Sequence, residues 1–140
     1  MQGEPTHHRV GDPGVRELFS EEARLQSWLD VEAALARAQA ELGIIPQYAA
    51  EEITRKARFE NLNTDNIRQG LERTGHPLVP MVWELDRICE GDAGGYIHWG
   101  ATTQNITQTG QLQRVRRAHV IFLNQLGALL QQLADLAEST

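Results

Sequence analysis

The 140-residue sequence contains a single cysteine and no excess of basic side chains. One cysteine, Cys89, excludes an intrachain disulfide framework and a zinc site built from clustered cysteines. Lys and Arg number 13 against 19 Asp and Glu, and the net charge of −6 argues against nucleic acid or an anionic membrane surface as the main partner. No apolar run approaches the roughly 20 residues that span a bilayer, and the polar N-terminus lacks the pattern of a signal peptide. These absences predict a cytoplasmic protein without a membrane partner.

The residues that are present predict an all-α fold. Hydrophobic residues make up 41% of the chain and charged residues 23%, a composition that excludes intrinsic disorder. The alternation of apolar and polar residues that is typical of strands is nearly absent. Capping and breaking residues predict helices after Ser20, over about 46–59, after Asn63 or Thr64, over about 77–89 and after Thr102–Thr103. We expect an N-terminal helical domain over 1–101, and over 102–140 the start of a domain built as a bundle of long helices.

The last predicted helix carries a heptad pattern over its whole length. Its seam has one polar member, His119, among apolar residues: Leu112, Val115, Phe122, Leu126, Leu129, Leu133 and Leu136. About 35 helical residues extend roughly 50 Å, whereas a compact globule of this size is only about 37 Å across. The helix should therefore overhang its own domain and pack against helices of other subunits or of a missing C-terminal part. The end at Thr140, soon after the seam, indicates a truncation.

The segment 94–105 has the densest set of candidate functional residues. Its glycines allow close approach of the backbone to a ligand, and Thr102 and Thr103 lie where the long helix should begin. The first-turn N–H groups and the helix dipole favour an anion there. A carboxylate would accept hydrogen bonds from the two threonines and from backbone amides, with Gln104 or Asn105 reading its second oxygen. The alternative is that a threonine simply caps the helix.

Two histidines lie beside predicted turns near helix ends. His76 and His98 are each suited to proton transfer or to pairing with a carboxylate near neutral pH. The alternative for either is a structural histidine with satisfied hydrogen bonds. Their spacing does not match a metal-binding pair on a helix, and the sequence has no EF-hand, phosphate loop or zinc motif. We therefore expect no metal site.

Three ordered motifs of this sequence resemble landmarks of the fumarase/aspartase superfamily. Residues 28–36, continued by 41–46, resemble the first long helix of that superfamily. Residues 74–80 and 98–105 resemble its next two landmarks. The resemblance covers nearly all of the chain. The nearest branch is 3-carboxy-cis,cis-muconate cycloisomerase, with adenylosuccinate lyase further off.

The resemblance implies an all-α homotetramer with a central bundle of long helices and active sites shared between subunits. Such enzymes use no cofactor. They abstract a proton next to a carboxylate and eliminate, or in reverse add, a substituent at the β-carbon. The resemblance assigns catalytic roles to His76 and His98, and binding of the substrate carboxylate to Thr102, Thr103 and Gln104, beside Asn105. The histidine acid and the serine base belong to two later regions that this chain lacks, so the isolated chain should be inactive.

Two departures from the family pattern bear on the substrate. Asn105 stands where an aspartate is usual, and Gln108–Thr109 replaces an Asp-Thr pair. The N-terminal arm also lacks the Arg-Tyr pair of adenylosuccinate lyases, so a small polycarboxylate is the expected substrate. Our first hypothesis is a lyase or cycloisomerase. The alternatives are an epimerase of the iminodisuccinate type on the same fold, and a non-catalytic helical assembly module.

Overall fold

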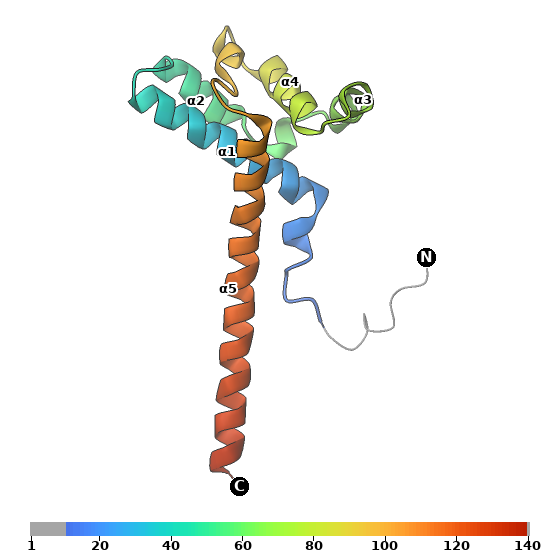
Figure 1. Cartoon of the computed structure of the whole chain (residues 1–140), viewed down its shortest axis with the longest axis vertical. Coiled ribbons are helices and arrows are strands. Elements are labelled where there is room, and N and C mark those ends of the chain that lie inside the picture. The colour runs from blue at the N-terminus through green and yellow to red at the C-terminus, as the bar shows by residue number, and fades with distance from the viewer. Residues whose placement is uncertain (1–10, 140) are drawn as a thin grey trace.

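The computed structural model describes residues 11–139, and this part of the chain is helical without strands, as predicted (Figure 1). The described residues form five α-helices and three short 3-10 turns: η1 precedes the first helix, whereas η2 and η3 lie in connections between helices. The 3-10 turns are Glu17–Phe19, Phe59–Asn61 and Ala93–Tyr96. The α-helices are α1 (Glu21–Glu41), α2 (Gln47–Lys56), α3 (Thr64–Thr74), α4 (Leu78–Ile88) and α5 (Thr103–Glu138).

Local capping determines most of the helix ends, which is why the sequence predicts them. The hydroxyl of Ser20 accepts a hydrogen bond from the Ala23 amide at 3.1 Å and caps α1. Asn63 caps α3 in the same way, accepting from the Asp65 amide at 3.0 Å. The helix predicted over 46–59 ends earlier, at Lys56, because a distant side chain competes for the backbone: the Phe59 amide donates to Gln26 Oε1 of α1 at 2.8 Å.

The core lies where α1 meets the other helices. Leu25, Trp28 and Leu29 of α1 are buried, as their spacing predicts. Leu35 is only partly buried, however, and Leu42 is 76% exposed at the end of the helix, so the apolar face of α1 is shorter than expected. The core residues contributed by the other helices are Ile53 of α2, Ile67 of α3, Leu78, Met81 and Leu85 of α4, and Ile106 of α5.

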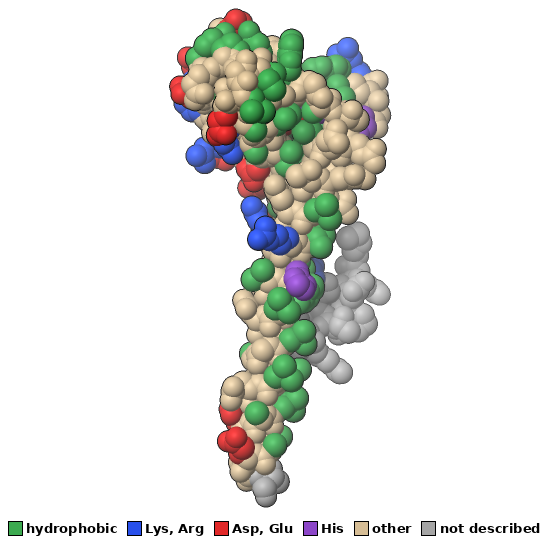
Figure 2. All heavy atoms as spheres, turned by 60° about the vertical axis from the view of Figure 1, so that its left-hand side comes forward, with side chains coloured by type: hydrophobic (Ala, Val, Ile, Leu, Met, Phe, Trp, Pro, Cys, Tyr) green, Lys and Arg blue, Asp and Glu red, His purple; other side chains and the backbone are tan. Residues whose placement is uncertain are grey.

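Helix α5 projects far beyond the head formed by the other helices (Figure 1). Its buried residues, Ile106, Gly110, Arg114 and Ala118, all lie in its N-terminal half. All the apolar seam residues are exposed, so the predicted overhang is confirmed. Figure 2 shows apolar side chains along the projecting part. The exposed apolar face of α5 consists of Leu112, Val115, Val120, Phe122, Leu123, Leu126, Leu129, Leu130, Leu133 and Leu136.

Helix α5 bears on the expectation that the chain has no membrane partner. By length and composition it could cross a membrane, and it is the one helix within residues 11–139 that meets this test. Polar residues such as Asn124 and Gln125 interrupt every apolar run, yet leucines raise the average hydropathy of the window. One such helix is weak evidence for a membrane. The heptad seam gives it an apolar face of the kind that packs against other helices.

Candidate functional site

The candidate site is built on the short loop that joins η3 to α5. Its backbone takes left-handed conformations at two positions, with φ of 61° at His98 and 67° at Gly100. Glycine adopts this conformation without strain, but histidine does so only at an energetic cost. Ile97 is buried and anchors the loop at its start, and the loop then leads directly into the first turn of α5.

Three hydrogen bonds that involve side chains hold this loop in place, two of them to α1. His98 Nδ1 lies 2.6 Å from Glu32 Oε1, across 66 residues of sequence. Gln39 Nε2 donates to the carbonyl oxygen of Trp99 at 2.7 Å. At the start of α5, the Thr102 amide donates to Asn105 Oδ1 at 3.1 Å. The loop is thereby fixed to a core helix on one side and to the α5 terminus on the other.

Glu32 is the most unusual residue of the site. It lies in the apolar face of α1, and its side chain is 0% exposed. Burial raises the pKa of the Glu32 carboxyl above its usual range, and the hydrogen bond with His98 opposes that rise. Oε2 of Glu32 has no hydrogen-bond partner among the described residues. His98 is therefore the only polar group in that part of the chain that hydrogen bonds to this carboxyl.

A shallow groove of about 410 Å³ runs between α1 and the start of α5, next to the loop. Trp99 of the loop and Asn105 of the first turn of α5 line it. The remaining lining residues are Val31, Ala34, Leu35, Gln39, Gly100, Ala101, Ile106 and Thr109. The groove is open to solvent, so a small molecule has access to the first turn of α5.

The four predicted binding residues gather at this helix start. Thr102 is the N-cap residue of α5, and Thr102, Gln104 and Asn105 are exposed while Thr103 is partly buried. No acidic residue lies in the first turn of α5. The N-terminal partial charge of a 36-residue helix is therefore available to an anion. Asn105 also has a structural role, because its Oδ1 accepts a hydrogen bond from the Thr102 amide.

His76 lies elsewhere, in the turn between α3 and α4. Its Nδ1 accepts a hydrogen bond from the Leu78 amide at 3.3 Å. The Thr74 hydroxyl donates to the His76 carbonyl oxygen and accepts from the His76 amide. Within residues 11–139, no hydrogen bond joins His76 to the loop or to the start of α5. This arrangement matches a structural histidine at the start of α4, and a catalytic role for His76 stays a prediction.

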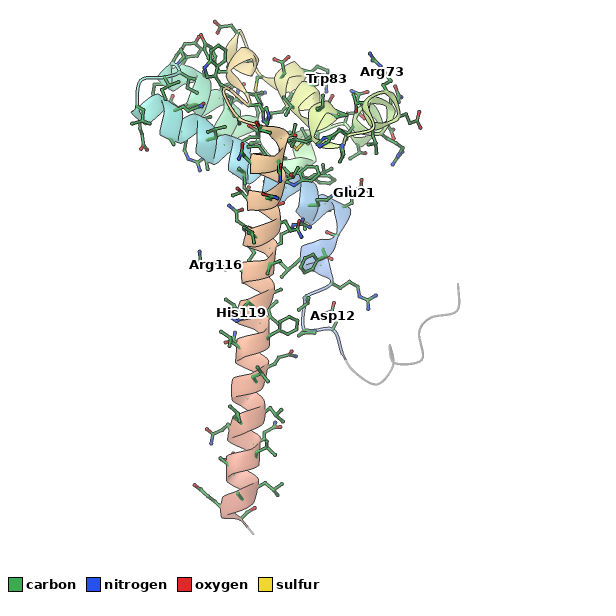
Figure 3. All side chains as sticks on the ribbon, in the orientation of Figure 1. Asp12, Glu21, Arg73, Trp83, Arg116 and His119 are labelled. Atoms are coloured by element: carbon green, nitrogen blue, oxygen red, sulfur yellow. The ribbon has the colours of Figure 1, made fainter. Side chains whose placement is uncertain are left out.

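His119, the polar member of the seam, is placed away from the loop. It lies on the projecting part of α5 (Figure 3), so it belongs to the seam and not to the groove. No three or more His, Cys, Asp or Glu side chains of residues 11–139 are grouped so that they would hold a metal ion.

Sequence reasoning missed Glu32 as a member of the site. It lies three residues after Leu29 and four before Ala36, both of which are buried. A carboxylate at that position in an apolar helical stripe is unusual, because an unpaired buried charge is costly. The spacing alone would have marked Glu32 as a group that needs a partner. Its partner follows only from the fold.

Comparisons with known proteins agree on one superfamily, although no protein-family model matches the sequence. The chain is 41% identical over 138 residues to adenylosuccinate lyase of Methanocaldococcus jannaschii, covering 99% of this chain and 30% of that protein. It is 39% identical over 131 residues to N-acetyl-S-(2-succino)cysteine lyase of Dickeya dadantii, covering 94% of this chain and 29% of that protein. The crystal structure of β-carboxy-cis,cis-muconate cycloisomerase from Acinetobacter calcoaceticus matches with a TM-score of 0.80 and 33% identity, over 89% of this chain and 30% of that one.

The chain thus spans about 30% of the length of these relatives. Identity is higher to the adenylosuccinate lyase than to the cycloisomerase, so the comparisons do not single out the cycloisomerase chemistry.

Proposed function

The chain is homologous to the N-terminal portion of lyases and a cycloisomerase of the fumarase/aspartase superfamily, and from this we propose that it forms the carboxylate-binding region of such an enzyme. The reaction we propose is cofactor-independent. A proton is removed next to a carboxylate of a small polycarboxylate, and a substituent on the β-carbon is eliminated or, in reverse, added. The acid and base of this reaction lie outside the 140 residues.

The observation that carries the proposal is the start of α5. Thr102 and Thr103 place two hydroxyl groups there, and the first turn contains no acidic side chain that would repel an anion. Amide groups of the first helical turn have no partner four residues back and donate to anions. In α5 the Asn105 amide already donates to the Thr102 carbonyl oxygen at 2.9 Å, so the donors that we assign to a ligand are the amides of Thr103 and Gln104. The groove lined by Trp99 and Asn105 lies next to this end of the helix, although Thr102 and Thr103 do not line it. A substrate carboxylate is the anion that fits.

The relatives support a polycarboxylate in particular. The names of two of them, adenylosuccinate lyase and N-acetyl-S-(2-succino)cysteine lyase, describe succinyl adducts. We extend to this chain a substrate of that class, with carboxylates on neighbouring carbons. One carboxylate would lie at Thr102 and Thr103, with Gln104 hydrogen bonded to its second oxygen. His98 would lie beside the reacting carbons.

We further propose that the exposed apolar face of α5 joins subunits into a homotetramer with shared active sites. That face runs from Leu112 to Leu136, outside the head of this chain. Contiguous exposed apolar surface of this extent marks an interaction site or an aggregation hazard. The same face also supports the second candidate, a helical assembly module without catalysis. Turnover by the complete enzyme decides between the two.

Steady-state kinetics of the complete enzyme on fumarate adducts and on carboxymuconate test the site. Thr102→Ala removes one charge-assisted hydrogen bond worth roughly 1.5–3 kcal/mol, so kcat/KM should fall about 10- to 150-fold. His98→Asn should cost at least as much. Asparagine tolerates the φ of 61° at this position, so the variant removes the ring while keeping the backbone.

Thr64→Ala, the same substitution at the first residue of α3, is the matched control and should leave kcat/KM unchanged. The site assignment is wrong if Thr102→Ala and His98→Asn behave like Thr64→Ala. The isolated chain should show no turnover, because it lacks the acid and the base, and each of these typically raises the reaction rate 10²- to 10⁴-fold.

A further inference from the structure

We propose that Glu32 is a positioning residue, which holds the ring of His98 in the Nδ1–H tautomer so that Nε2 is presented to the substrate. The inference rests on the proposed function for its catalytic meaning. Its structural content, the tautomer and its cause, is independent of the reaction.

The contact itself dictates the tautomer. An ionised carboxylate accepts hydrogen bonds and cannot donate them. When the Glu32 carboxyl is ionised, His98 Nδ1, at 2.6 Å from Oε1, carries the proton and donates it. In a neutral imidazole this leaves Nε2 with a free lone pair. No residue within 11–139 makes a hydrogen bond to Nε2, so it is available as an acceptor for a substrate proton.

Stability does not explain why a carboxylate is placed there. Its side chain is 0% exposed, and Oε2 finds no partner in the described part of the chain. A buried ion pair is often no more stabilising than apolar residues of similar volume, because desolvation offsets the attraction. An apolar side chain would therefore serve the packing of α1 equally well. What an ionised carboxylate supplies at this position, and an apolar side chain or an amide does not, is a partner for His98 that only accepts hydrogen bonds.

The backbone of the loop shows that His98 is held under strain. Its φ of 61° lies in the left-handed region, which is strained for a residue other than glycine. Such a conformation persists where surrounding interactions fix it. Here a hydrogen bond with Glu32 fixes the ring of His98, and a hydrogen bond from Gln39 at 2.7 Å fixes the carbonyl group of Trp99, the next residue.

The support for Glu32 is rigid. Leu29, Ala33 and Ala36 surround it on α1, and all three are at most 5% exposed. A side chain on a packed helix is located more precisely than one on a loop. This arrangement, a buried carboxylate behind the second nitrogen of a histidine, is the general means by which proteins set a ring's tautomer and orientation.

Nitrogen-15 NMR of the imidazole groups in the 140-residue chain tests the proposal directly. At pH 8 a histidine of ordinary pKa is neutral, so the two ring nitrogens report the tautomer. We expect His98 in the Nδ1–H form. Glu32→Gln keeps the volume, but its amide can donate to Nδ1 as well as accept, so this tautomer should no longer dominate. Glu32→Met, which cannot hydrogen bond, should abolish the preference.

Matched controls come from the same chain. Glu84→Gln neutralises another buried carboxylate that has no histidine partner, and it should leave the His98 spectrum unchanged. His76 and His119 serve as internal references in every spectrum. An Nε2–H form of His98 in the unmodified chain, or an unchanged Nδ1–H form in Glu32→Met, would overturn the proposal. Circular dichroism verifies that each variant is folded, and Glu32→Gln supplies the test if Glu32→Met is not.

A second readout separates this inference from the proposed function. In the complete enzyme, removal of a group that orients a working residue costs about 10- to 100-fold. We expect Glu32→Gln to lower kcat by that factor while KM changes less than threefold. If the tautomer depends on Glu32 as expected but His98→Asn leaves turnover unchanged, the proposed function of His98 fails and the positioning by Glu32 stands.

Discussion

Gly110 of α5 lies directly against Ser27 of α1, so close that a Cβ built on Gly110 would be 2.8 Å from the Ser27 hydroxyl oxygen. The same Cβ would be 2.8 Å from Cδ1 of Trp28 and 3.2 Å from the Ser27 carbonyl oxygen. At the crossing of α5 and α1, the backbone of Gly110 therefore packs directly against the side chains of Ser27 and Trp28. Only glycine fits at this position of α5. This crossing sets the direction in which α5 leaves the head.

Gly110→Ala should destabilise the chain by about 1–3 kcal/mol, because the added methyl group overpacks the crossing and the backbone carbonyl of Ser27 cannot turn away. Urea denaturation followed by circular dichroism measures the change. Gly127→Ala is the control on the same helix, since nothing lies within 4 Å of a Cβ there. It should stabilise the helix by roughly 0.5–1 kcal/mol through higher helix propensity. Equal effects of the two substitutions would show that the crossing is not tight.

Acid should weaken the junction of α3 and α4 through one buried carboxylate. Glu84 Oε1 accepts from Arg87 Nη2 at 2.6 Å and from the Asn63 amide at 2.9 Å, and Oε2 accepts from Asn66 Nδ2 at 3.0 Å. The hydrogen bond from Arg87, followed by those from Asn66 and Asn63, lowers the pKa of Glu84 to about 2. Because the folded-state pKa lies below the unfolded one, the stabilisation is complete above about pH 4.5 and is lost as the pH falls toward 2.

The corresponding loss of unfolding free energy is at most about 3 kcal/mol. Denaturation at pH 6 and at pH 3 measures it, and Glu84→Gln should flatten this part of the pH dependence. Glu22→Gln, an exposed carboxylate at the start of α1, should leave the pH dependence as it is. A Glu84→Gln variant that loses as much stability between pH 6 and pH 3 as the unmodified chain would contradict the assignment.

The apolar face of α5 should make the chain associate. Replacing Leu126 and Leu129 together with aspartate places charges in the interface, which costs several kcal/mol, so the assembly should dissociate. Sedimentation equilibrium measures the mass. The control carries the same two charges on the opposite side of the helix, as Asn124→Asp with Ala128→Asp, and should keep the assembled mass. A folded monomer before any substitution would exclude this face as an interface.

Asn105 should show a capping role that is separable from binding. Asn105→Ala removes the acceptor of the Thr102 amide and should lower stability by about 0.5–2 kcal/mol. Asn105→Asp keeps an acceptor there and adds a favourable charge near the helix dipole, so thermal melting should show a slight gain. If the helix start also binds a substrate carboxylate, the same charge should raise KM in the complete enzyme. An unchanged KM would reduce Asn105 to a cap.

The helices and the segment that carries the candidate site were predictable because their determinants are local. Ser20 and Asn63 begin helices through bonds to amides two or three residues away, and Thr102 does so at the start of α5. The seam of α5 was predictable for the same reason, since a heptad repeat depends only on spacing. The overhang followed from the length of this helix compared with the size of the domain.

The partner of His98 was decided by the tertiary structure alone. Glu32 precedes it by 66 residues, and only the packing of α1 beneath the loop brings the two side chains together. The separation of His76 from that loop, and the early end of α2 caused by Gln26, are likewise products of packing. Helix caps and heptads are short-range features of the chain. A buried hydrogen bond between distant segments exists only once the core has formed, because water would otherwise satisfy both groups.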